Sequence, residues 1–403
     1  MAYAFQRFNF ENRLQFETGI ETPLMPTVRP LTHAPGHHFF GYYGIDPWLA
    51  GANEHLALQT DFHDRRPTEA DEARVGLVDR ASGVFTELDR TRAFNLQQGA
   101  MLHVIDVGFG EEIVFNVWRD GRLGVRAVNP KSGLKRELHG SLAAVARHGA
   151  VALGLDRARS YHIRSVTGYA CGAEHFRGAC PADDGIFRLD LKTGSSTLVL
   201  PLSELLAAAP PPPGDYGAAW IDHLHLNPSG TRALLIGRIK LADSWLSSLW
   251  SVSPDGAGLK ALIPFGRKVS HFDWFDDETI LVSSNLLGPM QFILLNERTG
   301  AARALDPEVL PADGHASYRA DRRWLLCDTY PRGTPPRAQL FVYELASRRR
   351  VDVGPFDSPE PFRGDIRCDL HPRWSADGQS FTFDSIHEGS RQIYLAKVGD
   401  VAE

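Results

Sequence analysis

The chain has 403 residues, of which 43% are hydrophobic, 10% aromatic and 23% charged, and its formal net charge is −6. This composition is ordinary for a globular protein, and it lacks both the basic surplus of a nucleic-acid-binding protein and an apolar stretch long enough to span a bilayer. We therefore predict neither a nucleic-acid partner nor a membrane partner.

The N-terminal stretch MAYAFQRFNFENRLQF interrupts its apolar residues with polar and charged ones, so it does not resemble a secretory signal. The four cysteines show no CxxC spacing, which fits a reducing compartment. We expect a cytoplasmic protein with free thiols, or a periplasmic one if the N-terminus is processed. Cys171 and Cys180 flank a loop that contains His175, and a zinc site or a disulfide there is the alternative to free thiols.

A short hairpin pattern recurs along the chain, with an apolar strand, a turn usually formed by Ser or Thr and Gly, and a second apolar strand. Its copies lie at 78–88, 128–138, 189–200, 252–262 and 295–305, with a degenerate copy at 343–353. A second pattern alternates with it in the C-terminal half, in HLHLNPSG, HFDWFDD, HASYRAD and HPRWSADG, which begin at His223, His271, His315 and His371. Each copy reads as strand, turn, strand. Together the patterns predict four short antiparallel strands every ~45 to 60 residues, the period of a propeller blade.

Three further blades are predicted to open near His38, near Asn95 and at about Gly149, which makes seven. The last blade lacks room for a fourth strand, and we expect residues 1–30 to supply it. The sequence thus predicts an all-β protein, a seven-bladed β-propeller that forms one domain over residues 1–403.

The four aligned histidines indicate a site. The first strand of a blade lines the central channel, so residues at its entry end should meet at one mouth of that channel. Neutral imidazoles and a carboxylate are normal ligands of divalent metals, and we predict a metal site of His271, His315, Asp369 and His371. The alternative is that these histidines tie strands together without a ligand, as histidines do in WD-repeat propellers.

Over the same C-terminal half, the chain resembles the oligogalacturonate lyases and related propeller lyases such as the ulvan lyases. The stretch CDLHPRWSADG, with RQIY downstream, matches the last blade of the oligogalacturonate lyases best. The resemblance implies manganese, with zinc or calcium as alternatives, bound by His271 and His371. It also implies that His223 is the general base. Two positions depart from the family, because Asp369 replaces a histidine and Ile366 replaces a glutamine ligand. His315 or Cys368 would then complete the metal shell.

The implied reaction is β-elimination on a uronate-containing oligosaccharide or polysaccharide. A metal ion and Arg238 would neutralise the C5 carboxylate, and a histidine of near-neutral pKa would remove the C5 proton. Either a tyrosine or water would supply the acid. His38 and His63 in the first blade resemble the paired catalytic histidines of ulvan lyases and form a competing constellation.

We expect substrate contacts from the face that carries the histidines. The predicted substrate-binding residues are Tyr43, Gln98, Arg159 and Tyr318. Two other functions remain open. One is a non-catalytic propeller that binds a glycan or a protein, with a structural metal or none. The other is a glycosidase, which needs a pair of catalytic carboxylates. The predicted face is richer in His and Arg than in Asp or Glu, so this function ranks last.

Overall fold

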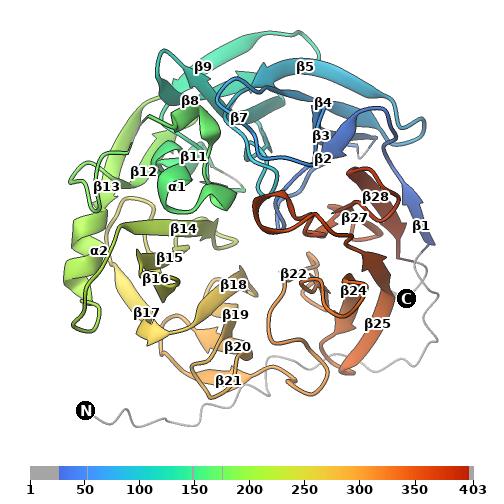
Figure 1. Ribbon diagram of the computed structural model, residues 1–403. Coiled ribbons are helices and arrows are strands. Elements are labelled where there is room, and N and C mark those ends of the chain that lie inside the picture. Colours follow the sequence, from blue (N-terminus) through green and yellow to red (C-terminus); the bar gives the residue numbers. More distant parts are fainter. Residues whose placement is uncertain (1–26, 52, 148, 175, 399–403) are drawn as a thin grey trace.

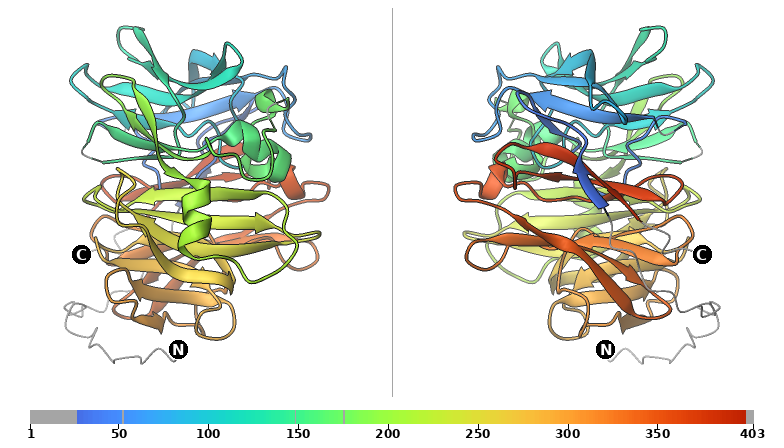
Figure 2. Two further views of the ribbon diagram at one scale, coloured as in Figure 1. Left: turned by 90° about the vertical axis from the view of Figure 1, so that its left-hand side faces the viewer. Right: turned by 90° about the vertical axis from the view of Figure 1, so that its right-hand side faces the viewer.

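The computed structural model describes residues 27–51, 53–147, 149–174 and 176–398. Within these ranges, seven four-stranded antiparallel sheets surround a central axis (Figure 1). In the side views, the sheets pack next to one another around the ring, and their strands run between its two faces (Figure 2). The fold is therefore a seven-bladed β-propeller, as predicted from the two repeated patterns.

In each of the first three blades, the strands follow in chain order from the innermost to the outermost. Blade one contains β2 (His37–Phe39), β3 (Glu54–Thr60), β4 (Ala73–Asp79) and β5 (Phe85–Thr91). Blade two contains β6 (His103–Ile105), β7 (Glu112–Arg119), β8 (Arg122–Val128) and β9 (Lys135–His139). Blade three contains β10 (Ala144–Val145), β11 (Val151–Gly154), β12 (Gly185–Asp190) and β13 (Ser196–Pro201).

The next four blades are also built from the inside outward. Blade four contains β14 (Ala219–Leu226), β15 (Ala233–Lys240), β16 (Trp245–Val252) and β17 (Lys260–Arg267). Blade five contains β18 (Val269–Trp274), β19 (Thr279–Ser284), β20 (Gln291–Asn296) and β21 (Ala302–Ala304). Blade six contains β22 (Ser317–Tyr318), β23 (Trp324–Asp328), β24 (Arg337–Glu344) and β25 (Arg349–Asp357). Blade seven contains β26 (Arg373–Trp374), β27 (Ser380–Ser385), β28 (Gln392–Lys397) and β1 (Thr27–Pro30).

The N-terminal strand β1 closes the ring by pairing antiparallel with β28. The pairing continues past the strand, because the backbone N–H of Leu31 donates to the carbonyl of Ile393 at 2.8 Å. The prediction that the N-terminal segment completes the last blade is thus confirmed for residues 27–30. The rest of that segment, 1–26, lies outside the described residues.

The recurring hairpin pattern corresponds to the turn between the third and fourth strands of blades one to six. In blade one, the carboxylate of Asp79 accepts the backbone N–H groups of Ala81 and Ser82, and Gly83 adopts a φ of +72°. A side chain that caps its own turn and a glycine in the left-handed region are both features of tight hairpins. The same contact is made by Asn129, Asp190 and Asn296, whereas the copies at 252–262 and 343–353 have no Asp or Asn at this position.

Two of the predicted blade openings were wrong. Asn95 and Gly99 form an isolated bridge in a tight turn, and the first strand of blade two begins later, at His103. The run after Gly149 is the second strand of blade three, because the first strand, β10, has only two residues. A two-residue strand is too short to show the alternation that would identify it in a sequence.

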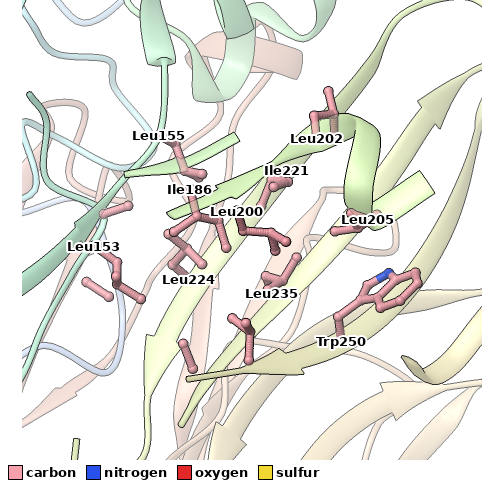
Figure 3. Close-up of a cluster of buried hydrophobic side chains, with 14 of the residues drawn as sticks. Leu153, Leu155, Ile186, Leu200, Leu202, Leu205, Ile221, Leu224, Leu235 and Trp250 are labelled. Atoms are coloured by element: carbon pink, nitrogen blue, oxygen red, sulfur yellow. The ribbon is translucent and has the colours of Figure 1, made fainter. Parts of the chain in front are cut away.

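Apolar side chains fill the spaces between neighbouring blades. In the cluster of blades three and four, Leu153, Leu235 and Trp250 are buried, and Leu202 and Leu205 of helix α2 (Leu202–Ala208) cover its outer side (Figure 3). The other helix, α1 (Arg157–Ile163), lies beside the strands of blade three in Figure 1. Short 3-10 turns follow it at Ser165–Thr167 and Ala170–Gly172, and a third lies at Gly364–Ile366. In the part of the chain that is described, no helix is long and apolar enough to cross a membrane.

Candidate functional site

After strand β2, the chain turns into the central channel. The N–H groups of Phe40 and Gly41 donate to the buried carboxylate of Asp384, which also accepts a 2.7 Å hydrogen bond from Arg373. Gly41 has a φ of +106°, and a Cβ atom there would lie 2.4 Å from the backbone nitrogen of Gly99. Only glycine fits this close approach of two backbones. The anchored turn places the next residues, Tyr42 and Tyr43, on the axis.

The four aligned histidines meet around these tyrosines. Ring centroids are 5.4 Å apart for His223 and His271, 4.2 Å for His271 and His315, and 4.1 Å for His315 and His371. The ring of Tyr43 lies 5.8, 5.3 and 6.1 Å from the last three of them. Histidines from four successive blades thus form one continuous row, as the shared register predicted.

Local backbone irregularities turn the histidines toward the axis. The pairing of β14 with β15 shifts register at His223, which has a φ of +50°, and His371 has a φ of +41°. The pairing of β18 with β19 shifts at His271. A bulge re-aims one side chain without disturbing the rest of the strand. Positive φ at non-glycine residues is uncommon and is concentrated at functional sites.

Carboxylates orient two of the imidazoles. Asp328 accepts from Nδ1 of His315 at 2.8 Å and from the backbone N–H of His371 at 3.0 Å. Asp313 faces Nδ1 of His271 at 3.1 Å. A carboxylate on one ring nitrogen fixes the tautomer and leaves the other nitrogen free to bind a metal, which is the usual arrangement at metal sites.

Three of the four predicted metal ligands come within reach of one ion. The ligand atoms of His315, Asp369 and His371 all lie within 4.8 Å of one another, and all three residues are buried. His271 stands next to His315 but outside this group. Both oxygens of Asp369 accept hydrogen bonds from Arg367, at 2.6 and 2.7 Å. Because a carboxylate has about four lone-pair sites, Asp369 could still ligate an ion while it is bonded to arginine.

The two histidines of this group differ in their ionisation. Burial, together with the neighbouring His315, lowers the pKa of His371 well below its ordinary value, so this imidazole is neutral. Burial also acts to lower the pKa of His315, but the nearby Asp328 outweighs it and the net pKa is raised. Cys368, the alternative ligand, does not join the group, and burial raises the pKa of its thiol to about 12. Two imidazoles and a carboxylate fit a divalent first-row metal better than calcium, which prefers oxygen ligands.

A second group of polar side chains surrounds His223. The hydroxyl of Tyr42 and Nδ1 of His223 share a hydrogen bond, and Nε2 lies 3.8 Å from Asp222. Asp222 also pairs with Arg164 at 2.8 Å and with Arg238 at 3.4 Å. Burial lowers the pKa of His223 well below its ordinary value, so the imidazole is neutral.

Trp245 lies at the edge of this group and is 42% exposed. The guanidinium carbons of Arg164 and Arg238 lie 5.0 and 5.5 Å from the centre of its ring. Two arginines share the single carboxylate of Asp222, which leaves one positive charge in excess beside an exposed aromatic face. This combination suits a ring-shaped ligand that carries a carboxylate.

The predicted pair of His38 and His63 does not form. His38 is held between Gln392 and Gln59 at 2.9 and 2.8 Å, and His63 stacks on His37 at 3.9 Å instead. Neighbouring residues of a strand point to opposite faces, so only one of the two adjacent histidines can face His63. The structure thus places His37, and not His38, beside His63.

Two of the predicted substrate contacts are engaged within the protein. Arg159 is 1% exposed, pairs with Asp184 at 2.8 Å and donates to the carbonyls of Gly178, Ala179 and Ala219. Gln98 is buried, and its side-chain oxygen accepts from Arg157. The structure therefore gives both residues a role in tying the loops of this mouth together.

The two predicted tyrosines lie apart. Tyr43 is on the axis, where its hydroxyl donates to the carbonyl of Phe272 at 3.1 Å. Tyr318 follows His315 by three residues, which moves it about 10 Å along an extended strand toward the other mouth. There its ring packs against Phe275.

Several residues of the site were not among the predicted ones: Tyr42, Arg164, Asp222, Asp313 and Arg367. Asp222 directly precedes His223, and Arg367 lies two residues before Asp369, so proximity along the sequence was a usable signal for both. No repeated pattern marks Arg164 or Asp313. They reach the site through loops that differ from blade to blade.

No protein-family model matches the chain, and no curated protein does either. Solved structures do match. An oligogalacturonate lyase in complex with manganese has a TM-score of 0.63 at 16% identity, with 93% of each chain covered. The chain has an oligogalacturonate lyase-like fold. The oligogalacturonate lyase of Vibrio parahaemolyticus matches with a TM-score of 0.63 at 14% identity, covering 96% of this chain and 98% of that one.

Propellers of other activities match less well. The tricorn protease has a TM-score of 0.52 at 12% identity, covering 94% of this chain but 34% of its own. Since one fold hosts many functions, the likeness gives the architecture, and the reaction has to be argued from the site.

Proposed function

We propose that the protein is a metal-dependent lyase that cleaves a uronate-containing oligosaccharide or polysaccharide by β-elimination. The observation that carries this proposal is the adjacency of two groups at one mouth of the channel. One is the carboxylate-oriented histidine row with its three potential ligands. The other is a neutral histidine flanked by two arginines and an exposed tryptophan.

The metal would be held by His315, Asp369 and His371, with His271 beside them. The solved lyase of the same fold is a manganese complex, and manganese is therefore our first choice, with zinc next. Such an ion would neutralise the uronate carboxylate and make the C5 proton more acidic.

The remaining steps belong to residues of the chain. Trp245 would stack on a sugar ring, and Arg164 and Arg238 would pair with its carboxylate in place of part of their contact with Asp222. His223 would take the C5 proton as the C4–O4 bond breaks and the C4=C5 double bond forms. Tyr42 is the candidate acid for O4. Burial raises its pKa, so its hydroxyl keeps its proton, and its hydrogen bond to His223 allows that proton to be restored.

The test uses protein loaded with manganese and a panel of uronate oligosaccharides, followed by ultraviolet absorbance of the unsaturated product. His223→Ala should reduce the rate by about 10²- to 10⁴-fold while metal and glycan binding remain. His225→Ala is the matched control, because His225 lies on the same strand but contacts Asp273 toward the other mouth. An unchanged rate in His223→Ala would contradict the assignment of the base.

A second candidate is a non-catalytic propeller that binds a glycan or protein partner, with a structural metal or with none. The ion pair between Arg367 and Asp369 favours it, because it already neutralises the one carboxylate of the ligand group. If the wild type binds a uronate oligosaccharide but releases no unsaturated product from any member of the panel, this second candidate is correct.

The cytoplasmic location of the protein stays a prediction.

A further inference from the structure

The opposite side of Tyr42 and Tyr43 holds a separate cavity of about 400 Å³, the axial pocket. The first strands of several blades run through the channel. Residues at one end of these strands form the histidine row, and residues at the other end form the walls of the axial pocket. On β14 and β18, for example, His225 and Asp273 line the pocket two residues beyond His223 and His271. The axial tyrosines therefore divide the channel into two sites. The volume is at the lower end of the roughly 300 to 1,000 Å³ that is typical of small-molecule sites.

Two arginines at this pocket form no direct ion pair. Arg147 and Arg322 line it, and in the described part of the chain neither guanidinium has an ion-pair or hydrogen-bond partner. Asp46 and Asp273 also line the pocket, but neither forms an ion pair with the two arginines among the described residues. The oxygens of Asp273 accept the backbone N–H groups of Trp274 and Tyr318 at 2.8 Å, and one of them faces His225 at 3.3 Å. The pocket therefore presents two guanidinium groups that have no direct ion-pair partner, and both can bind an anion.

Two buried polar atoms of the lining also lack a partner. Trp48 and Ser317 are each 4% exposed, and neither Nε1 of Trp48 nor Oγ of Ser317 has a hydrogen bond among the described residues. Buried polar groups are almost always satisfied, and exceptions point to water or a ligand. Asp46, also in the lining, uses one oxygen to accept the N–H of Trp48 at 3.1 Å, which leaves the other for a hydroxyl donor.

We propose that the axial pocket binds a small hydroxylated anion about the size of one acidic monosaccharide. Arg147 and Arg322 bind its carboxylate or phosphate. The polar atoms of Trp48, Ser317 and Asp46 bind hydroxyl groups, and the tyrosine and tryptophan rings of the lining cover its apolar faces. This site is distinct from the histidine mouth, and its occupancy does not depend on the proposed lyase activity.

The test is calorimetric titration of metal-free protein with glucuronate, glucose 6-phosphate and uncharged glucose. Both anions should bind, and glucose should bind at least about tenfold more weakly, because hydrogen bonds to charged groups contribute most of the affinity. Comparison of the two anions shows whether carboxylate or phosphate is preferred. If neither anion binds, the proposal is wrong and the pocket holds only water.

Variants locate the binding. The double substitution Arg147→Gln/Arg322→Gln should raise the Kd of the anions about tenfold or more. Ala376→Trp, at an exposed residue of the lining, should abolish binding by filling the pocket. Arg122→Gln removes the same charge from an exposed position of β8 and should change nothing. Circular dichroism would verify that each variant is folded.

Arg164→Gln separates the two mouths. It removes a charge beside His223 and should leave anion binding in the axial pocket intact. If Arg164→Gln abolishes binding while the Arg147/Arg322 variant retains it, the anion occupies the histidine mouth and the axial-pocket proposal is overturned. Absence of elimination in the lyase assay would leave this comparison unaffected.

Discussion

Asp328 is the residue whose replacement tests the candidate metal centre most directly, since it contacts two potential ligands without belonging to the ligand group. Its carboxylate accepts Nδ1 and the backbone N–H of His315, both at 2.8 Å, and the backbone N–H of His371 at 3.0 Å. Asp328→Asn keeps the shape but offers one acceptor oxygen and an NH₂ group. At least one of the three donors then faces another donor.

Two effects of Asp328→Asn are expected. Loss of a carboxylate behind a metal-binding histidine costs 10- to 100-fold in metal affinity, so the Kd for manganese should rise by about that factor. An unsatisfied buried donor should also lower the free energy of unfolding of the metal-free protein by about 1–3 kcal/mol. Titration calorimetry with manganese and zinc measures the first effect, and urea denaturation in the presence of a chelator measures the second.

Asp357→Asn is the matched control, because the side chain of Asp357 is 52% exposed and pairs with Arg337 on the surface. Asp313→Asn tests the neighbouring histidine. It should weaken metal binding only if His271 joins the ligand shell, because Asp313 contacts Nδ1 of that residue. A Kd for Asp328→Asn that stays within about twofold of the wild-type value would refute a metal centre built on His315 and His371.

Three further predictions concern stability. Leu31→Ala should lower the free energy of unfolding by about 2–5 kcal/mol in urea denaturation, because Leu31 is fully buried beside Ile393. Leu134→Ala, at an exposed position, is the control. Equal losses of stability in both variants would contradict a role of Leu31 in closing the ring. Arg159→Met should cost about 3–5 kcal/mol by leaving Asp184 buried without its cation, and a loss below about 1 kcal/mol would show that the pair is dispensable. Burial and the adjacent His37 lower the pKa of His63 to about 4. The unfolded chain therefore takes up a proton as the pH falls from 6.5 to 4 while the folded protein does not, and stability declines across that window. His63→Gln should flatten this decline in thermal melts, and an identical pH profile would contradict the shifted pKa.

The sequence predicts the ring and the histidine row well because both depend on repetition. The Ser/Thr–Gly turns between third and fourth strands recur with local hydrogen bonds of their own, as at Asp79, and need no tertiary information. The same holds for the register of His223, His271, His315 and His371 within their blades. Blade three was misread where repetition fails, at the two-residue strand β10.

The partners of those histidines could not be predicted in this way. Asp328 and Tyr42 reach His315 and His223 from a second strand and from another blade. Arg159 was predicted to bind substrate, but it is buried among the loops around α1. Such contacts depend on how loops of unequal length fold over the channel, and one sequence carries no periodic signal for that.

The closure of the ring by β1 affects how the protein is made. Strand β1 precedes all other described strands in the chain, and its partner β28 follows all of them. During synthesis, β1 therefore has no pairing partner until the other six blades have been made. Domains generally fold in the order in which they are synthesised, but this seventh blade cannot form in that order. His371 belongs to the same blade. The nascent chain therefore exposes an unpaired sheet edge, and the candidate metal site becomes complete only when the two ends of the ring join.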